Sequence, residues 1–134
     1  MPTTKKISAQ EFKTWLDGAF IGSPADARSH CEQTMSPNYL RFQAGGDRTD
    51  FERAVEKVAF FRANSRKWES RVHFFSQDDN KIAARLICNI AIGDQPEQCI
   101  ELMFMAELDD EGRFELVWEQ SAEYSGANKE RDRT

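Results

Sequence analysis

Two side chains of this 134-residue chain are the strongest candidates for moving a proton, the carboxyl group of Glu119 and the imidazole of His73. Glu119 directly follows Trp118, and a carboxyl group that an aromatic neighbour shields from water is suited to general acid/base catalysis. Histidine is the side chain that ordinarily changes charge near neutral pH. We therefore expect Glu119 to be the first candidate for catalysis and His73 the second, with a surface or interface role as the alternative for each.

Two further polar residues occupy alternate positions of the short segment 39–43. A guanidinium such as that of Arg41 can hold an enolate or carboxylate oxygen, and the Tyr39 hydroxyl can donate a hydrogen bond to the same oxygen. Both residues are therefore predicted to stabilise negative charge during catalysis. A salt bridge from Arg41 to an acidic surface residue is the alternative.

Four aromatic side chains and one amide are predicted to bind the substrate. An aromatic ring offers a large apolar contact area, although core packing would also explain these rings. Gln120 differs, because a polar group at the end of an apolar strand face needs a hydrogen-bond partner such as a ligand or water. The predicted substrate-binding residues are Trp15, Phe42, Phe104, Trp118 and Gln120.

The composition argues against several classes of partner. The formal net charge of -5 disfavours a nucleic-acid surface, which requires clustered Lys and Arg. No apolar run approaches the ~20 residues that cross a bilayer, so no membrane partner is expected. The N-terminal segment MPTTKKIS lacks the apolar stretch of a signal peptide, which makes the cytoplasm the expected location.

Motifs for cofactor-dependent chemistry are missing from the sequence, which has no phosphate-binding loop, metal-ligand cluster or nucleophilic triad. An enzyme of this sequence is therefore expected to work without a metal ion or a nucleotide cofactor. The three cysteines, Cys31, Cys88 and Cys99, are widely spaced and are expected to be buried free thiols.

Three helices are predicted in the first half of the chain. Ser8 and Glu11 form a capping box that opens the first helix, and apolar residues follow at helical spacing. Thr49 and Glu52 form a second capping box, which opens the third helix. The predicted helices cover about residues 8–21, 23–35 and 50–65.

From Trp68 onward the hydrophobic period changes to two, which indicates β-strands. The segments between them are rich in turn-forming residues, so consecutive strands should be antiparallel neighbours. With a brief strand at residues 39–43, this predicts a mainly antiparallel sheet of four to five strands. Helices first and strands afterwards indicate an α+β fold with the helices on one sheet face. The four later strands are predicted over about residues 68–77, 81–92, 97–108 and 113–124.

One domain is expected over residues 8–124. Residues 1–7 are predicted to be a flexible arm. Residues 125–134 carry no large apolar side chain, which predicts a disordered polar tail.

Alternation assigns the strand residues to two faces. One face is apolar and is expected to point at the helices; it includes Phe74 and Trp118 and ends at Gln120. The opposite face mixes apolar and charged residues and would carry Glu119 and His73, unless a bulge or the strand's end reverses the alternation. An apolar patch with a charged rim is typical of a partner surface, so we expect a homodimer through this outer face.

Three segments carry a family resemblance: MSPNY at residues 35–39, NKIAARL at 80–86, and ELDDEGRF at 107–114 with Val117-Trp118-Glu119 behind it. In this order they resemble the turn before the first strand, the strand after an acidic turn and the last hairpin of one protein group. That group is the SnoaL-like polyketide-cyclase-type domains of the nuclear-transport-factor-2-like superfamily. The resemblance spans about residues 8–124.

The resemblance implies a cone-shaped roll with a pocket between sheet and helices. Many members are cofactor-free cyclases, dehydratases, isomerases or epoxide hydrolases and others only bind ligands or proteins, so the fold alone does not define the activity. Two positions depart from the family pattern. Gln43 stands where ketosteroid-isomerase-like members have a catalytic Asp. SnoaL-like cyclases often have a catalytic Asp shortly after the Trp of the last strand, whereas here Glu119 is the one acidic residue of the stretch after Trp118.

The sequence thus predicts a cofactor-independent isomerase, cyclase or dehydratase acting on a hydrophobic small molecule, such as a polyketide or terpenoid intermediate of secondary metabolism. A non-catalytic small-molecule binding domain and a homodimeric interaction module are the alternatives. An enclosed cavity with a buried carboxylate or histidine would favour the enzyme.

Overall fold

The computed structural model describes residues 5–43 and 45–125. Helix α1 (Ala9–Gly18) begins at the predicted capping box, since the Ser8 hydroxyl accepts from the Glu11 amide and the Glu11 carboxylate accepts from the Ser8 amide, both at 3.0 Å. Its apolar residues Phe12, Trp15 and Leu16 recur at helical spacing and are all buried. The sequence therefore places α1 correctly, and this helix delivers the aromatic side chains of the interior.

The next two helices also follow the prediction, with one correction at a cap. A 3-10 turn (Pro24–Asp26) leads into α2 (Ala27–Thr34), and α3 spans Phe51–Asn64. The predicted capping box at Thr49 and Glu52 is wrong. Asp50 caps α3 by accepting a hydrogen bond from the Arg53 amide at 2.9 Å. Thr49 is instead a buried residue of a short strand and accepts a hydrogen bond from Lys57.

The sheet has six strands, one more than the largest number expected. The extra strand is the three-residue β2, and β1 begins earlier than predicted because it continues directly from α2. The order β2-β1-β6-β5-β4-β3 is antiparallel except for β1 and β6, which pair in parallel. The strands are β1 (Met35–Gln43), β2 (Arg48–Asp50), β3 (Ser65–Asp78), β4 (Lys81–Ile92), β5 (Gln98–Leu108) and β6 (Phe114–Glu123).

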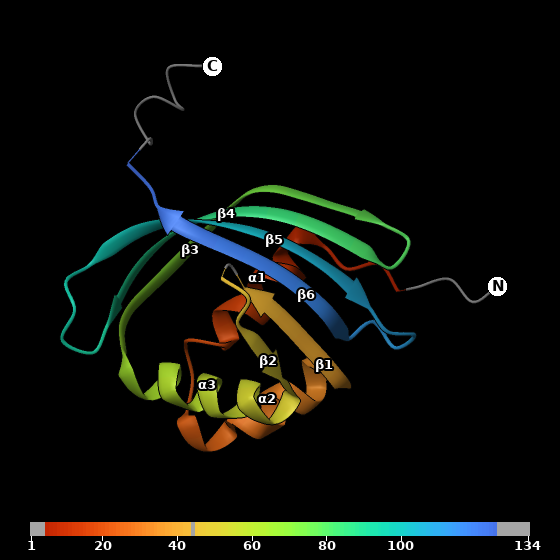
Figure 1. Ribbon diagram of the computed structural model, residues 1–134, viewed down its shortest axis with the longest axis horizontal. Helices are drawn as coiled ribbons and strands as arrows, with labels where there is room; N and C mark the ends of the chain where they lie inside the picture. Colours follow the sequence, from red (N-terminus) through yellow and green to blue (C-terminus); the bar gives the residue numbers. More distant parts are fainter. Residues whose placement is uncertain (1–4, 44, 126–134) are drawn as a thin grey trace.

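The helices lie together on one side of the curved sheet (Figure 1). This arrangement confirms the predicted α+β roll and its antiparallel meander from β3 to β6. The predicted arm at residues 1–7 and tail at residues 125–134 fall mainly outside the described residues. Within the described part of the chain, no helix has the length and apolar character needed to span a membrane.

Two β-bulges decide which side chains enter the interior. In β3 the pairing skips His73, and in β6 it skips Glu115. One extra residue on a strand sends every later side chain to the opposite face. Glu119 therefore pairs with the buried Phe104 and lies on the inner face, whereas Trp118 pairs with the exposed Met105.

Several predicted face assignments are consequently wrong. Phe74, Trp118 and Gln120 lie on the outer face, each beyond a bulge, and all three are exposed. Phe75 packs against the core and Val117 is fully buried in their place. The sequence leaves open that a bulge could move Glu119 to the inner face, and the bulge in β6 does so.

The core is built around the ring of Phe12, which has no exposed surface. It lies 5.0 Å from the ring of Phe104 and 5.5 Å from that of Phe75, measured between centroids. The rings of Trp15 and Phe114 stack beside it at 3.9 Å. Aromatic contacts at such distances add to the burial of apolar area, so α1 is held firmly against the sheet.

Asp17 ties the end of α1 to β3. Its carboxylate accepts hydrogen bonds from the Trp68 indole at 2.8 Å and the Ser70 hydroxyl at 2.6 Å, and it pairs with Lys13 at 2.7 Å. Trp68 and Ser70 are both buried and require these bonds. The contact fixes Trp68, which forms part of the wall of the interior cavity.

Two of the three cysteines are buried free thiols, as expected. Cys31 and Cys88 have no exposed surface, while Cys99 is half-buried. Burial raises the pKa of Cys31 to about 11 and that of Cys88 to about 12. Both side chains are therefore neutral thiols at physiological pH and lack the thiolate that a nucleophile needs.

The half-buried imidazole of His30 should make the fold sensitive to acid. Its burial, and then the charge of Arg62, lower its pKa from 6.5 to about 4. Between these values the unfolded chain binds the proton and the folded chain does not, so stability falls as the pH drops from 6.5 to 4. We expect this residue to account for a loss of at most about 3 kcal/mol across that range, because solvent screens part of the effect.

Urea unfolding of wild type and His30→Gln at several pH values measures this effect. The variant should show a shallower loss of stability between pH 6.5 and 4. Equal slopes for the two proteins would contradict the assignment to His30.

Candidate functional site

An interior cavity of about 190 Å³ is lined by residues of the helices and of the sheet. Most of its wall is apolar and comes from α1, α3 and the central strands. Trp15, Leu16, Phe20, Val58, Phe61 and Leu102 form much of this wall. At about 30 Å³ for each molecule in the liquid, the space equals about six waters. It is therefore sized for a small ligand or for one part of a larger ligand.

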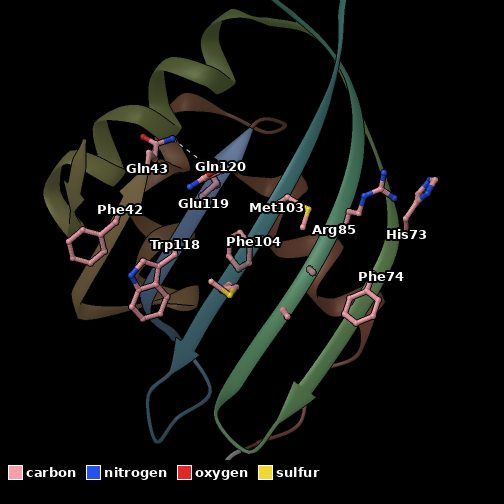
Figure 2. Close-up of a pocket in the computed structure, with 13 residues that line it drawn as sticks. Phe42, Gln43, His73, Phe74, Arg85, Met103, Phe104, Trp118, Glu119 and Gln120 are labelled. Atoms are coloured by element: carbon pink, nitrogen blue, oxygen red, sulfur yellow. Dashed lines mark hydrogen bonds between the residues drawn. The ribbon is translucent and has the colours of Figure 1, made fainter. Parts of the chain in front are cut away.

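The polar side chains of the cavity wall come from β1, β6 and α3. Parallel pairing sets Gln43 directly beside Glu119, and Arg41 precedes Gln43 on the same face. The Gln43 amide donates to the Glu119 carboxylate at 3.0 Å, drawn as a dashed line in Figure 2. The nearest nitrogen of Arg41 lies 4.0 Å from the other carboxylate oxygen. The Glu119 side chain is only 12% exposed, so a largely buried carboxylate borders an apolar cavity.

Three buried donors in the cavity wall or beside it have no hydrogen-bond partner among the described residues. They are Trp15 Nε1, the Tyr39 hydroxyl and Arg41 Nε. A buried donor without a partner is costly, and a ligand oxygen would satisfy it. Tyr39 is 1% exposed, and burial raises the pKa of its hydroxyl despite the nearby charge of Arg41. Tyr39 is thus a neutral phenol that can donate a proton to a hydrogen bond.

This arrangement supplies the parts needed for proton transfer. The Glu119 carboxylate can accept a proton, and the Gln43 amide holds one of its oxygens in place. The Arg41 guanidinium offers positive charge and a free Nε donor close to the carboxylate. A substrate oxygen that gains negative charge would be stabilised by these donors.

The outer face of the sheet carries a wider groove of about 820 Å³ (Figure 2), which shares Gln43 and Glu119 with the wall of the interior cavity. Phe42 and Trp118 lie on neighbouring strands with their ring centroids 6.3 Å apart. Met103 and Phe74 expose 51% and 56% of their surface. At the far side of the groove Arg85 pairs with Glu101 at 2.7 Å. This groove combines exposed apolar side chains with a charged rim.

The structure distributes the predicted site residues over these two regions, and Glu119 borders both. Trp15, Arg41 and Glu119 line the interior cavity, and Tyr39 is buried next to them. Phe104 faces inward as predicted and packs in the aromatic core. The remaining predicted residues, His73, Phe42, Trp118 and Gln120, line the outer groove. Glu119 and Gln43 border the outer groove as well as the interior cavity, whereas His73 lines the outer groove alone.

Sequence reasoning missed three polar residues of the cavity wall, Gln43, Lys57 and Ser121. In the sequence, Gln43 is evident only as a departure from the family pattern. The signal that could have found it is its spacing, because Gln43 lies two positions after Arg41 and so shares its strand face. In the described part of the chain, no group of three or more His, Cys, Asp or Glu side chains is placed to hold a metal ion.

No protein-family model matches the sequence, and no curated protein matches it. Solved structures do match the fold. An LEH-like epoxide hydrolase of M. tuberculosis superposes with a TM-score of 0.62 at 13% identity, over 81% of this chain and 80% of that one. A candidate SnoaL-like polyketide cyclase from Jannaschia sp. CCS1 gives 0.62 at 12% identity, over 87% and 90% of the two chains.

A third similar structure is a hypothetical protein from Catenulispora acidiphila with a ketosteroid isomerase-like fold, solved in complex with trimethylamine. It superposes with a TM-score of 0.66 at 8% identity, over 84% of this chain and 85% of that one. At such identities the likeness concerns the fold.

Proposed function

We propose that this chain, which has the nuclear-transport-factor-2-like fold of SnoaL-like and ketosteroid isomerase-like proteins, is a cofactor-independent proton-transfer enzyme. Its reaction is an isomerisation, cyclisation or dehydration of a small hydrophobic carbonyl compound. The observation that supports this most strongly is the carboxylate of Glu119, largely buried and on the wall of an apolar cavity. A polyketide or terpenoid intermediate is a substrate of suitable chemistry.

In the proposed reaction the Glu119 carboxylate removes a proton from the carbon beside the substrate's carbonyl group. The electron pair of that C–H bond moves to the carbonyl oxygen, which becomes an enolate. Arg41 and Tyr39 donate hydrogen bonds to this oxygen and stabilise its charge. Glu119, now protonated, returns the proton to another atom of the substrate or to a leaving hydroxyl group, which completes an isomerisation or a dehydration.

Deuterium exchange tests this function without knowledge of the natural substrate. Small carbonyl compounds are incubated with the protein in D₂O, and deuterium at the carbon beside the carbonyl is followed by NMR. Protein-dependent exchange in at least one compound is the expected result. A panel of cyclic and linear enones and diketones without any such exchange would contradict the proposal.

A second candidate function rests on the outer groove, which supports a homodimer. Trp118, Met105 and Phe74 are exposed on a single face, and charges of both signs surround them. A two-fold axis brings the same face of two copies together. Arg85 and Glu101 on this face provide opposite charges that could meet across such an axis. The occupant that these features favour is therefore a second copy of this chain.

Sedimentation velocity at micromolar concentrations tests the dimer. We expect wild type to sediment as a dimer and Met105→Glu as a monomer, because the variant places a charge in the apolar centre of the face. Ile21→Glu is the matched control, since Ile21 is equally exposed at 56% but lies outside the sheet. A monomeric wild type at high micromolar concentration would contradict this candidate.

A further inference from the structure

A second hollow of about 410 Å³ adjoins the interior cavity between β1 and α3. We call it the vestibule. It shares four wall residues with the cavity, namely Arg41, Gln43, Lys57 and Phe61. The two spaces therefore meet at the polar end of the cavity, where Glu119 is located.

One face of α3 forms the outer wall of the vestibule. Its contributions come from positions 53, 56, 57, 60 and 61, which recur at three- and four-residue spacing and so lie on one side of the helix. Phe60 and Phe61 provide an apolar contact, and Phe60 is 55% exposed. Arg53 and Lys57 add positive charge beside them. The wall is amphipathic, with cationic and aromatic side chains next to each other.

The wall of the vestibule carries more cations than carboxylates. Its wall holds Arg41, Arg53 and Lys57 but one carboxylate, Glu56. Lys57 is shared between Thr49 at 2.7 Å and Asp47 at 3.4 Å.

Of the vestibule's cations, the guanidinium groups of Arg41 and Arg53 have the most hydrogen-bond donors without a partner among the described residues. Arg41 is 4.0 Å from Glu119, and its Nε donor has no partner among the described residues. Across residues 5–43 and 45–125, the exposed Arg53 guanidinium makes no hydrogen bond or ion pair. Both groups are thus available to an anion that enters the vestibule.

We propose that the ligand of the interior cavity is an amphiphilic acid whose carboxylate is held in the vestibule by Arg53, with Lys57 and Arg41 beside it. Its short apolar part enters the cavity along the wall formed by Phe61 and Trp15. A guanidinium binds a carboxylate through two parallel hydrogen bonds, which fixes its orientation. The anionic end would then determine which carbon of the substrate reaches Glu119. This inference rests on the proposed function, because it assumes that ligands enter this cavity.

A pair of probes of the same length tests the anion site. Hexanoate and hexanamide differ in charge but present the same carbon chain to the cavity. Binding is followed at low ionic strength through the fluorescence of Trp15 and Trp68, which line the cavity. We expect hexanoate to bind wild type at least about tenfold more tightly, because a charged acceptor forms the stronger hydrogen bonds.

Arg53→Gln should remove most of this preference and leave the affinity for hexanamide unchanged. Arg53 is exposed on α3, so the variant should fold normally. Lys6→Gln is the charge-matched control, because it also removes one exposed positive charge, and Lys6 does not line the vestibule. The segment around Lys6 contacts β3 instead, through hydrogen bonds of Lys5 and Ile7 with Gln77. This control should keep the preference for hexanoate.

The outcomes separate the two proposals. Equal affinity of wild type for both probes, or a preference that survives in Arg53→Gln, would overturn the anion site and leave the cavity as a ligand site. If neither hexanoate nor hexanamide binds to wild type, the anion site is overturned as well. The deuterium-exchange assay then decides independently whether the protein moves protons.

Discussion

Glu119→Gln should reduce protein-dependent deuterium exchange by about 10²–10⁴-fold, the range that a positioned general acid/base contributes. The amide has nearly the shape of the carboxylate and can still contact Gln43, whose side chain lies 3.0 Å from Glu119. What it loses is the ability to accept a proton from carbon. The measurement is the exchange rate by NMR, with thermal unfolding to establish that the variant is folded.

The matched control for this substitution lies on the same strand. Glu123 is an exposed carboxylate near the end of β6, and Glu123→Gln makes the same chemical change without touching the cavity. Its exchange rate should equal that of wild type. A folded Glu119→Gln protein with an unchanged rate would remove Glu119 from the reaction.

Phe12→Ala should lower the free energy of unfolding by about 3–5 kcal/mol, the usual cost of truncating a buried aromatic residue. Phe12 has no exposed surface and contacts four aromatic rings from α1 and the sheet. Its removal leaves a void at the place where α1 is fixed to β5. Because small domains are stable by only about 5–15 kcal/mol, this single change removes a large share of the total.

Urea unfolding followed by circular dichroism measures this loss. Phe60→Ala is the control, because the same truncation at a side chain that is 55% exposed should change stability by about 0.5 kcal/mol or less. Similar values for the two variants would contradict the central place given to Phe12 in the core.

Local signals in the sequence were sufficient for most of the fold. The capping box at Ser8 and Glu11 acts within four residues, so the structure reproduces it directly. The turn segments between β3 and β6 impose hairpin connections, which fix the antiparallel order without long-range information. The short strand β2 was not predicted, because its one buried residue, Thr49, is polar and lies between two exposed charged residues, so no apolar alternation marks the strand.

The faces of β3 and β6 could not be predicted because apolar residues occupy both sides of these strands. In β6, Leu116 and Trp118 continue the alternation that begins at Phe114, so the sequence indicates an unbroken strand. The bulge at Glu115 instead turns Val117 and Glu119 inward. In β3 the bulge at His73 has the same effect on Phe74 and Phe75. The alternation of apolar and polar side chains reveals a bulge only where one face of the strand is clearly polar, because only then does the pattern visibly shift by one residue.

The cavity and its vestibule depend on contacts between distant parts of the chain. Arg41 and Lys57 come from β1 and α3, and Glu119 follows more than sixty residues later. The parallel pairing of β1 with β6 brings Gln43 beside Glu119. Because the pairing partner of β1 leaves no local signal, the sequence could propose Arg41 and Glu119 separately but could not place them together.

The central claim is that Glu119 faces a ligand cavity inside the domain, and a crystal structure with bound hexanoate tests it most directly. We expect the carbon chain in the interior beside Trp15, its carboxylate at Arg53, and Glu119 hydrogen-bonded to Gln43 at the cavity wall. A structure with Glu119 turned to the outer face, or with the ligand in the groove between Phe42 and Met103, would contradict the account.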